Sequence, residues 1–367
     1  MVGECSNVRL SMIDNRVAYS VFIGYSACND ALGCRVPASD GTYAVTLDDA
    51  TRRYLDWCAS QGIPRLHEMS PSEARAFEAG FRHLYGPGPA MYRELEATVE
   101  ADGRTIALRC LIPKDDPDAV VVYYHGGGWV VGDIDDYTTF GRTLAKRTGA
   151  VVVLVNYRLA PEHPYPAALE DAWSALCWVD ERLSHLTGNG TSPLVVAGDS
   201  AGGCLAAVIA QRAKQRNGPP LALQVLLCPV TDCDLTTPSY RDQVNELRLT
   251  TDTMRWFWDL YLPDTRERRH PDASPLRSQD VAGLPPAIIV TAEHDVLRDD
   301  GERYAAHLQG AGVSVSLRRF AGQMHGFISM INVIPASEDA IDYIARGIRS
   351  SLLQESTGEH GAGRSQA

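Results

Sequence analysis

The chain has 367 residues, and its 46 Asp and Glu outnumber its 34 Lys and Arg, which leaves a formal net charge of −12 at pH 7. Apolar residues make up 45% and charged residues 22% of the sequence, as in globular proteins and unlike disordered or fibrous ones. The acidic balance, without clustered Lys and Arg, argues against a nucleic acid as partner. The longest uninterrupted apolar run has seven residues (204–210), so no transmembrane segment is expected.

The first 45 residues lack a clear apolar pattern, and we expect them to form an extension outside the fold. Within them, residues 17–27 (VAYSVFIGYSA) are similar to a short export signal that would end at Cys28. Acidic residues precede this stretch and Tyr25 stands where a lipoprotein signal prefers Leu, which favours an extension or an upstream start codon. The nine cysteines are scattered without a C-x-x-C pair, which indicates free thiols in a reducing compartment, and hence a cytoplasmic protein without a metal site.

The rest of the chain begins with a helical segment, about 47–90, that contains the helix-start signal Ser70-Pro71-Ser72-Glu73. A second irregular segment, about 235–274, contains a helix start at Thr250 followed by several aromatic residues. Neither segment follows the pattern of strand and helix seen elsewhere in the chain. We expect both to fold over one end of the core as a lid.

From residue 119 onward, short apolar runs alternate with helical patterns, which is typical of a parallel sheet with crossover helices. The predicted strands are Ala119–Tyr124, Ala150–Val155, Leu194–Ala197, Leu223–Leu227, Ala287–Thr291 and Ser314–Phe320. The predicted helices are Ala167–Leu183, Ala201–Gln215, Gly301–Leu308 and about Ser337–Leu353. Continuous Val and Ile, without alternating polar residues, indicate strands that are covered on both faces. The sequence therefore predicts an α/β protein with a doubly wound sheet.

The strongest chemical signal is Gly198-Asp199-Ser200-Ala201-Gly202-Gly203, a G-x-S-x-G motif between a predicted strand and a predicted helix. In this context a sharp turn exposes the serine hydroxyl, and only glycine tolerates the crowding on either side. A serine that merely caps the helix is the alternative interpretation. The flanking strand, the helix and the additional Gly203 favour Ser200 as a nucleophile.

A serine nucleophile requires a base that accepts its proton and a carboxylate that orients the base. In chain order, the acid and then the histidine follow later strands. Asp295 and His325 each follow one of the last two predicted strands, so together with Ser200 they are the predicted catalytic residues. Alternatives remain open, namely Glu293, Asp299 and Asp300 for the acid and His294 for the base.

A glycine-rich loop, His125-Gly126-Gly127-Gly128-Trp129, directly follows the first predicted strand. Consecutive glycines allow backbone N–H groups to point into a cavity and to approach a developing oxyanion. We predict that Gly127 and Gly128 supply two such donors and that Ala201, after the nucleophile, supplies a third. A phosphate-binding loop is disfavoured, because the glycines are not spaced as G-x-G-x-x-G and no Lys-Ser or Lys-Thr follows.

Together these motifs resemble the hormone-sensitive lipase family of α/β-hydrolases. The resemblance rests on His125-Gly-Gly-Gly128, Asn156–Asp171 (NYRLAPEHPYPAALED), Gly198–Gly203, Ser274-Pro-Leu276, Asp295–Asp299 and His325-Gly-Phe327. It extends from about Leu47 to Leu353, and the first 45 or so residues have no counterpart in it. The resemblance implies an α/β-hydrolase domain over residues 46–354, in which the two irregular segments form a helical cap. Residues 355–367 contain little apolar surface, and we expect them to form a disordered tail.

The resemblance also implies a serine carboxylic ester hydrolase that forms an acyl-enzyme, needs no cofactor or metal, and acts on short to medium acyl esters of about C2 to C8. An amidase, N-formyl hydrolase or deacetylase of a secondary metabolite would use the same residues, and the sequence does not decide between ester and amide. A ligand-binding or lyase derivative of the fold is disfavoured, because such derivatives typically lose the serine or the histidine.

Three aromatic residues are predicted to line the substrate pocket. Trp129 and Phe327 each adjoin a catalytic motif, and Trp256 lies in the aromatic-rich helix. The helical spacing around Trp256 suits plain packing equally well. The expected partner is a small-molecule ester, and the expected assembly is a monomer or a homodimer.

Overall fold

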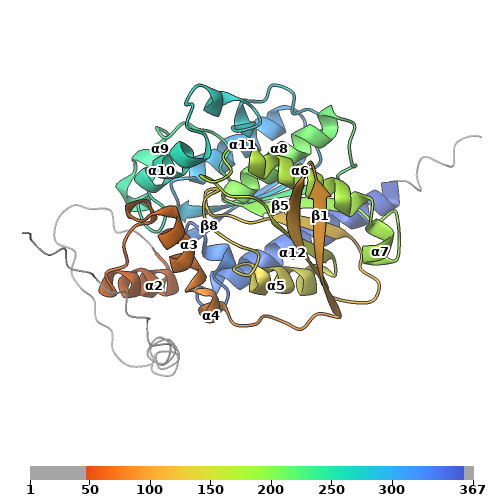
Figure 1. Cartoon of the computed structure of the whole chain (residues 1–367), viewed down its shortest axis with the longest axis horizontal. Helices are drawn as coiled ribbons and strands as arrows, with labels where there is room; N and C mark the ends of the chain where they lie inside the picture. The colour runs from red at the N-terminus through yellow and green to blue at the C-terminus, as the bar shows by residue number, and fades with distance from the viewer. Residues whose placement is uncertain (1–46, 359–367) are drawn as a thin grey trace, which may run out of the picture. The chain divides into compact units, whose positions relative to one another are not determined.

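The structure, a computed structural model, describes residues 47–358. The predicted extension over residues 1–45 lies outside the described residues. The described chain builds an eight-stranded sheet with helices on both faces (Figure 1). The strands are β1 (Arg93–Ala101), β2 (Arg104–Ile112), β3 (Val120–Tyr124), β4 (Val151–Asn156), β5 (Leu194–Asp199), β6 (Leu223–Leu227), β7 (Ala287–His294) and β8 (Val315–Met324).

The α-helices are α2 (Asp49–Ser60), α3 (Pro71–Ala79), α4 (Arg82–Tyr85), α5 (Thr138–Thr148), α6 (Ala167–Asp180), α7 (Leu183–Thr187), α8 (Ala201–Gln215), α9 (Pro238–Arg241), α10 (Thr251–Tyr261), α11 (Arg298–Gly310) and α12 (Ala336–Gly358). The 3-10 helices are η1 (Leu66–Glu68), η2 (Gln243–Asn245), η3 (Glu267–Arg269), η4 (Pro275–Arg277) and η5 (Phe327–Ser329). No helix within residues 47–358 combines the length and the apolar character that crossing a membrane requires.

The sheet is mostly parallel, in the order β1-β2-β4-β3-β5-β6-β7-β8. β2 runs antiparallel to both of its neighbours, and each pair from β4 to β8 is parallel. The six predicted runs form β3 to β8, and β3 and β6 are buried along their whole length. The prediction that the strands are covered on both faces is wrong for β8, an edge strand that is exposed or half-buried over residues 315–319. In Figure 1, α5 and α12 cover one face of the sheet, and α6, α8 and α11 cover the other. The predicted fold class is therefore confirmed.

The hairpin of β1 and β2 and the helix α5 are not among the predicted elements. β1 is an edge strand in which exposed and covered side chains alternate, so it has no continuous apolar run. Leu95, Ala97 and Val99 lie on its covered face. The turn at Asp102 and Gly103 has φ values of 48° and 75°, as a tight two-residue hairpin turn requires. Period-two alternation followed by Asp-Gly is the signal that predicts such a hairpin.

The last helix, α12, extends beyond the predicted helix end at Leu353. It continues to Gly358, into the first residues of the segment 355–367 that we predict as a tail. Gln354 and Glu355 have high helix propensity, which favours continuation of the helix even where apolar residues are few.

The order of the strands creates a crevice at β3. The chain passes from β3 to β4 on one side of β3, and then to β5 on the other side. At such a switch point, the connecting loops diverge at the carboxyl ends of the strands and leave room for a ligand. The loop 125–129 follows β3 and Ser200 follows β5, so the two predicted motifs meet at this crevice.

The two irregular segments lie against each other. In Figure 1, α2 and α3 from the first segment and α9 and α10 from the second occupy the same side of the view. The 3-10 helix η1 contacts α10, and His67 Nδ1 lies 2.9 Å from Thr253 Oγ1. Both helix starts that the sequence indicates are present, because the hydroxyl of Ser70 caps α3 and that of Thr250 caps α10.

Candidate active site

Ser200 occupies the sharp turn between β5 and α8. Its φ of 54° and ψ of −118° form a conformation that residues with a side chain rarely adopt. A Cβ on Gly198 would lie 2.2 Å from the carbonyl oxygen of Gly202, and a Cβ on Gly202 would lie 1.9 Å from that of Tyr124. Only glycine fits at either position, so the motif spacing follows from the close approach of β3, β5 and α8.

The structure brings His325 and Asp295 to Ser200. His325 Nε2 lies 3.0 Å from Ser200 Oγ, and His325 Nδ1 lies 2.7 Å from Asp295 Oδ2. Asp295 is buried, and its other oxygen accepts the backbone N–H of Leu297 at 2.9 Å. A carboxylate that accepts Nδ1–H leaves Nε2 free to accept a proton from the serine. The three side chains therefore form a continuous chain of hydrogen bonds, in which Nε2 of His325 is placed to accept the serine proton and Asp295 holds the ring.

The alternative acids are engaged elsewhere, and the alternative base is not hydrogen-bonded to Ser200 within residues 47–358. The carboxylates accept backbone N–H groups from other loops, Glu293 from Gly322, Asp299 from Ser239, and Asp300 from Thr231 and Asp232. Asp299 and Asp300 lie in the first turn of α11, where the helix dipole favours negative charge. His294 Nε2 lies 3.8 Å from Glu293, and within residues 47–358 it has no hydrogen bond to Ser200.

The glycine loop after β3 lines the same cavity as Ser200. Gly127 and Gly128 have φ values of 107° and 60°, and within residues 47–358 neither amide donates a hydrogen bond. The amide of Ala201 belongs to the first turn of α8, where backbone donors have no acceptor inside the helix. A Cβ on Gly128 would lie 2.1 Å from the Phe257 ring, so this position also requires glycine. Three unpaired amides are thus close to Ser200.

A partly buried carboxylate in the cavity wall, which sequence analysis did not identify, supports this loop. Asp199 accepts hydrogen bonds from the hydroxyls of Tyr123 at 2.8 Å and Tyr137 at 2.9 Å. The hydroxyl of Tyr137 also accepts the Gly126 N–H at 3.1 Å. Burial raises the pKa of Asp199, and the two hydroxyl donors oppose that shift. The position of Asp199 next to Ser200 is a sequence signal for this role, whereas nothing local marks Tyr137.

His125 lies behind the loop and does not line the cavity. Its ring stacks on Tyr157 with 4.3 Å between centroids, and its Nδ1 lies 2.7 Å from the carbonyl oxygen of Gly126. Burial lowers the pKa of His125 to about 4, so the ring is neutral at pH 7. His125 therefore supports the backbone of the loop.

A cavity of about 100 Å³ opens at Ser200, and the predicted pocket residues Trp129 and Phe327 do not line it. Trp129 has a φ of 60°, is fully buried, and stacks on Tyr261 with centroids 4.2 Å apart. Phe327 is also fully buried, with its ring 5.3 Å from that of Phe320. Both side chains turn into the core beneath the motifs that they adjoin, which corrects the prediction.

Trp256 does not line the cavity either, but its neighbour Phe257 does. Successive residues of a helix point about 100° apart, so only one of the two rings can face Ser200. The Phe257 ring lies directly against Gly128. The structure therefore places Phe257, and not Trp256, of this helix in the cavity wall.

Charged residues line the cavity as well, and sequence analysis did not identify them. Glu78 of α3 pairs with Arg248 at 2.7 Å, and Asp136 pairs with Arg82 of α4. The partners of each pair are far apart in the sequence, so no motif connects them. The cavity is consequently more polar than the predicted lining of three aromatic side chains would make it.

Three side chains lie close enough together to be compared with a metal site. Within residues 47–358, Cys228, Asp295 and His325 form the one group of three potential ligands whose donor atoms lie within 4.8 Å of one another. Burial raises the pKa of the Cys228 thiol well above its ordinary value, and metals bind the thiolate form. Asp295 and His325 are already hydrogen-bonded to each other. This donor set is therefore poorly suited to a metal.

The sheet, the serine turn after β5, and the acid and histidine after β7 and β8 define an α/β-hydrolase. A family model described as alpha/beta hydrolase fold matches residues 121–329. The chain belongs to this family, and the resemblance to hormone-sensitive lipases is confirmed.

Named relatives agree with this assignment. The chain is 44% identical over 271 residues to the carboxylesterase NlhH of Mycobacterium tuberculosis, an alignment that covers 71% of this chain and 84% of the relative. It is 35% identical over 295 residues to an ethyl acetate hydrolase of Pseudomonas putida, covering 78% and 92%. The crystal structure of a thermostable esterase from Pseudomonas putida superposes with a TM-score of 0.80 at 36% identity, covering 85% of this chain and 99% of that one.

Proposed function

We propose that this carboxylic ester hydrolase forms a covalent acyl-enzyme on Ser200. His325 removes the hydroxyl proton as Ser200 attacks the ester carbonyl, and Asp295 holds the imidazole in the required tautomer. The amides of Gly127, Gly128 and Ala201 are the proposed donors to the oxyanion. His325 then protonates the leaving alcohol, and a water molecule repeats the sequence to release the acid.

One observation carries this proposal, the pair of hydrogen bonds through His325. The 3.0 Å distance from Nε2 to Ser200 Oγ is within reach for proton transfer, and the 2.7 Å distance from Nδ1 to Asp295 orients the ring. The unpaired amides in the cavity wall support the proposed oxyanion hole.

Labelling with a fluorophosphonate probe tests the nucleophile. We expect one labelled residue, Ser200, and a loss of about 10⁴ to 10⁶ in turnover of p-nitrophenyl acetate for Ser200→Ala. Ser329→Ala is the matched control, because Ser329 lines the same cavity and its hydroxyl donates to the carbonyl oxygen of Gly326. Labelling of a Ser200→Ala protein, or near-native turnover by it, would contradict the assignment.

We propose that the substrates are esters with short to medium acyl chains, about C2 to C8. The small volume of the cavity supports short chains, and one relative is named for hydrolysis of ethyl acetate. Amides are weaker candidates, because no relative reported above is named as an amidase. A panel of esters and matched amides measures this preference, and faster turnover of the amides would contradict it.

We also propose that the segments 47–90 and 235–274 form the cap over this site. Leu66 and Phe257, one from each segment, line the cavity, which supports that arrangement.

A cytoplasmic location is proposed because the six cysteines within residues 47–358 are all free. Cell fractionation tests the location, and sedimentation distinguishes the two assemblies that we expect, a monomer or a homodimer.

A further inference from the structure

An ion pair forms one wall of the cavity at Ser200. Arg248 precedes α10 and its Nη2 lies 2.7 Å from Glu78 Oε2 of α3, and both side chains are mostly buried. Arg248 Nη1 lies 3.4 Å from the position that a Cβ on Gly326 would occupy, directly after His325. The guanidinium therefore stands on the His325 side of the cavity, where the leaving alcohol must depart.

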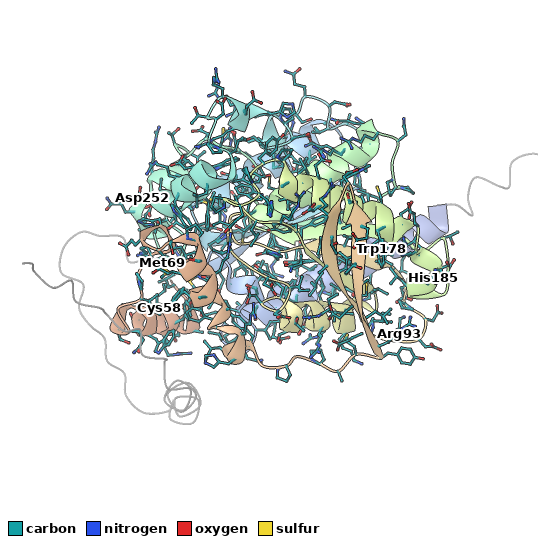
Figure 2. The ribbon with its side chains drawn as sticks, in the orientation of Figure 1. Cys58, Met69, Arg93, Trp178, His185 and Asp252 are labelled. Carbon is teal, nitrogen blue, oxygen red and sulfur yellow. The ribbon has the colours of Figure 1, made fainter. Side chains whose placement is uncertain are left out.

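A second cavity, of about 290 Å³, lies on the other side of this ion pair. We call it the outer cavity. Its walls come from α2, α3, the chain between α2 and η1, and the residues that precede α10. Leu66, Glu78 and Arg248 line both cavities, so they are the partition between them. Figure 2 labels Cys58, a residue of the outer cavity, on the same side of the molecule as Met69 and Asp252.

The outer cavity is mainly apolar. Its walls include Leu55, Ile63, Pro64, Phe77 and Phe81. Each methylene group that moves from water into such surroundings gains about a factor of four in affinity. A substrate chain that reached this space would bind well, whereas a chain that stops at the partition meets two charged groups that are costly to desolvate.

We propose that the Glu78–Arg248 pair limits the length of the substrate chain, and that the outer cavity is an apolar extension of the active site which this pair closes. The inference rests on the proposed ester hydrolysis at Ser200. Because Glu78 neutralises the charge of Arg248, the pair acts as a wall and not as a receptor for an anionic substrate. Glu78 and Arg248 are thus specificity-determining residues.

The test must remove both charges together, because one unpaired buried charge destabilises the fold. Glu78→Ala/Arg248→Ala removes the charges and the bulk, and so joins the two cavities. Glu78→Leu/Arg248→Met removes the charges and keeps most of the bulk, which makes it the matched control. Leu66→Ala thins the partition without touching the ion pair, and it serves if the double alanine variant fails to fold.

The assay measures kcat/KM for p-nitrophenyl esters of increasing acyl length and for acetates of increasing alcohol length. In the alanine double variant we expect the ratio of C10 to C4 activity to rise at least about 60-fold in one series, as three or more methylenes enter apolar surroundings at about fourfold each. The Leu/Met control should keep the wild-type ratio, and Leu66→Ala should shift it in the same direction by less. Adding Cys58→Trp, which fills the outer cavity, should cancel the gain.

An unchanged ratio in both series for the alanine double variant and for Leu66→Ala would overturn the proposal. An equal shift in the Leu/Met control, or a gain that survives Cys58→Trp, would also overturn it, because the outer cavity would then not receive the chain. Wild-type hydrolysis of p-nitrophenyl acetate keeps this result separate from the proposed function. If the wild type does not hydrolyse that ester, the proposed function is wrong. If it does, and the variants keep the wild-type chain-length profile, only the proposed role of the Glu78–Arg248 pair is wrong.

Discussion

Replacement of Gly128 by alanine tests the proposed oxyanion hole. The added Cβ would lie 2.1 Å from Phe257 Cγ, whereas carbon atoms in contact are about 3.5 to 4.0 Å apart. Either the loop or the ring must therefore move by about 1.5 Å. Because loss of one oxyanion donor costs about 10² to 10³ in kcat, or about 3 to 4 kcal/mol, we expect a loss of that size in p-nitrophenyl acetate turnover.

Two further variants isolate the cause of this loss. Gly283→Ala is the control for backbone strain, because Gly283 also has a positive φ (70°) but has nothing within 4 Å of an added Cβ. Gly128→Ala/Phe257→Ala removes the ring, and we expect it to recover part of the lost activity. If folded Gly128→Ala keeps turnover within about fivefold of wild type, the substitution has not displaced an oxyanion donor and the reasoning fails.

Two other predictions concern stability. Burial lowers the pKa of His125 from 6.5 to about 4, so His125 is protonated at a higher pH in the unfolded chain than in the folded protein. Urea unfolding should therefore show a loss of up to about 3 kcal/mol in stability as the pH falls from 6.5 to 4. The loss should be smaller in His125→Gln. Asp171 is fully buried and accepts hydrogen bonds from Arg104 and Arg158, so Asp171→Ala should cost about 3 to 5 kcal/mol in the same assay. A pH dependence in His125→Gln equal to that of wild type, or a cost below about 1 kcal/mol for Asp171→Ala, would contradict these assignments.

The strands of the sheet can be predicted where burial on both faces requires a continuous apolar run in the sequence. β3 to β6 lie inside the sheet, so their sequences are continuous apolar runs, and Ala201–Gln215 is predicted to the residue because a glycine-flanked turn marks its start. β1 is covered on one face only, and its charged residues break any apolar run. A search for continuous apolar runs therefore misses β1, although period-two alternation would detect it.

The candidate site also has one part that the sequence predicts and another that it does not. Ser200, the glycine loop, Asp295 and His325 each follow a strand, so parallel strands bring them to one edge and sequence order is enough to identify them. Side-chain direction is less local, since Trp129 stacks on Tyr261 from another segment and leaves the cavity wall to Phe257.

The ion pair that we propose limits the substrate chain is the part of the site that is hardest to predict from the sequence. Glu78 and Arg248 are 170 residues apart in the chain, and neither lies in a motif. Their pairing depends on how two irregular segments pack on each other, which short-range patterns do not encode. The proposed chemical step needs only residues at strand ends, whereas the shape of the cavity depends on contacts between the segments that we propose cover it. Substrate range should therefore change with few substitutions in these segments while the proposed catalytic residues stay fixed.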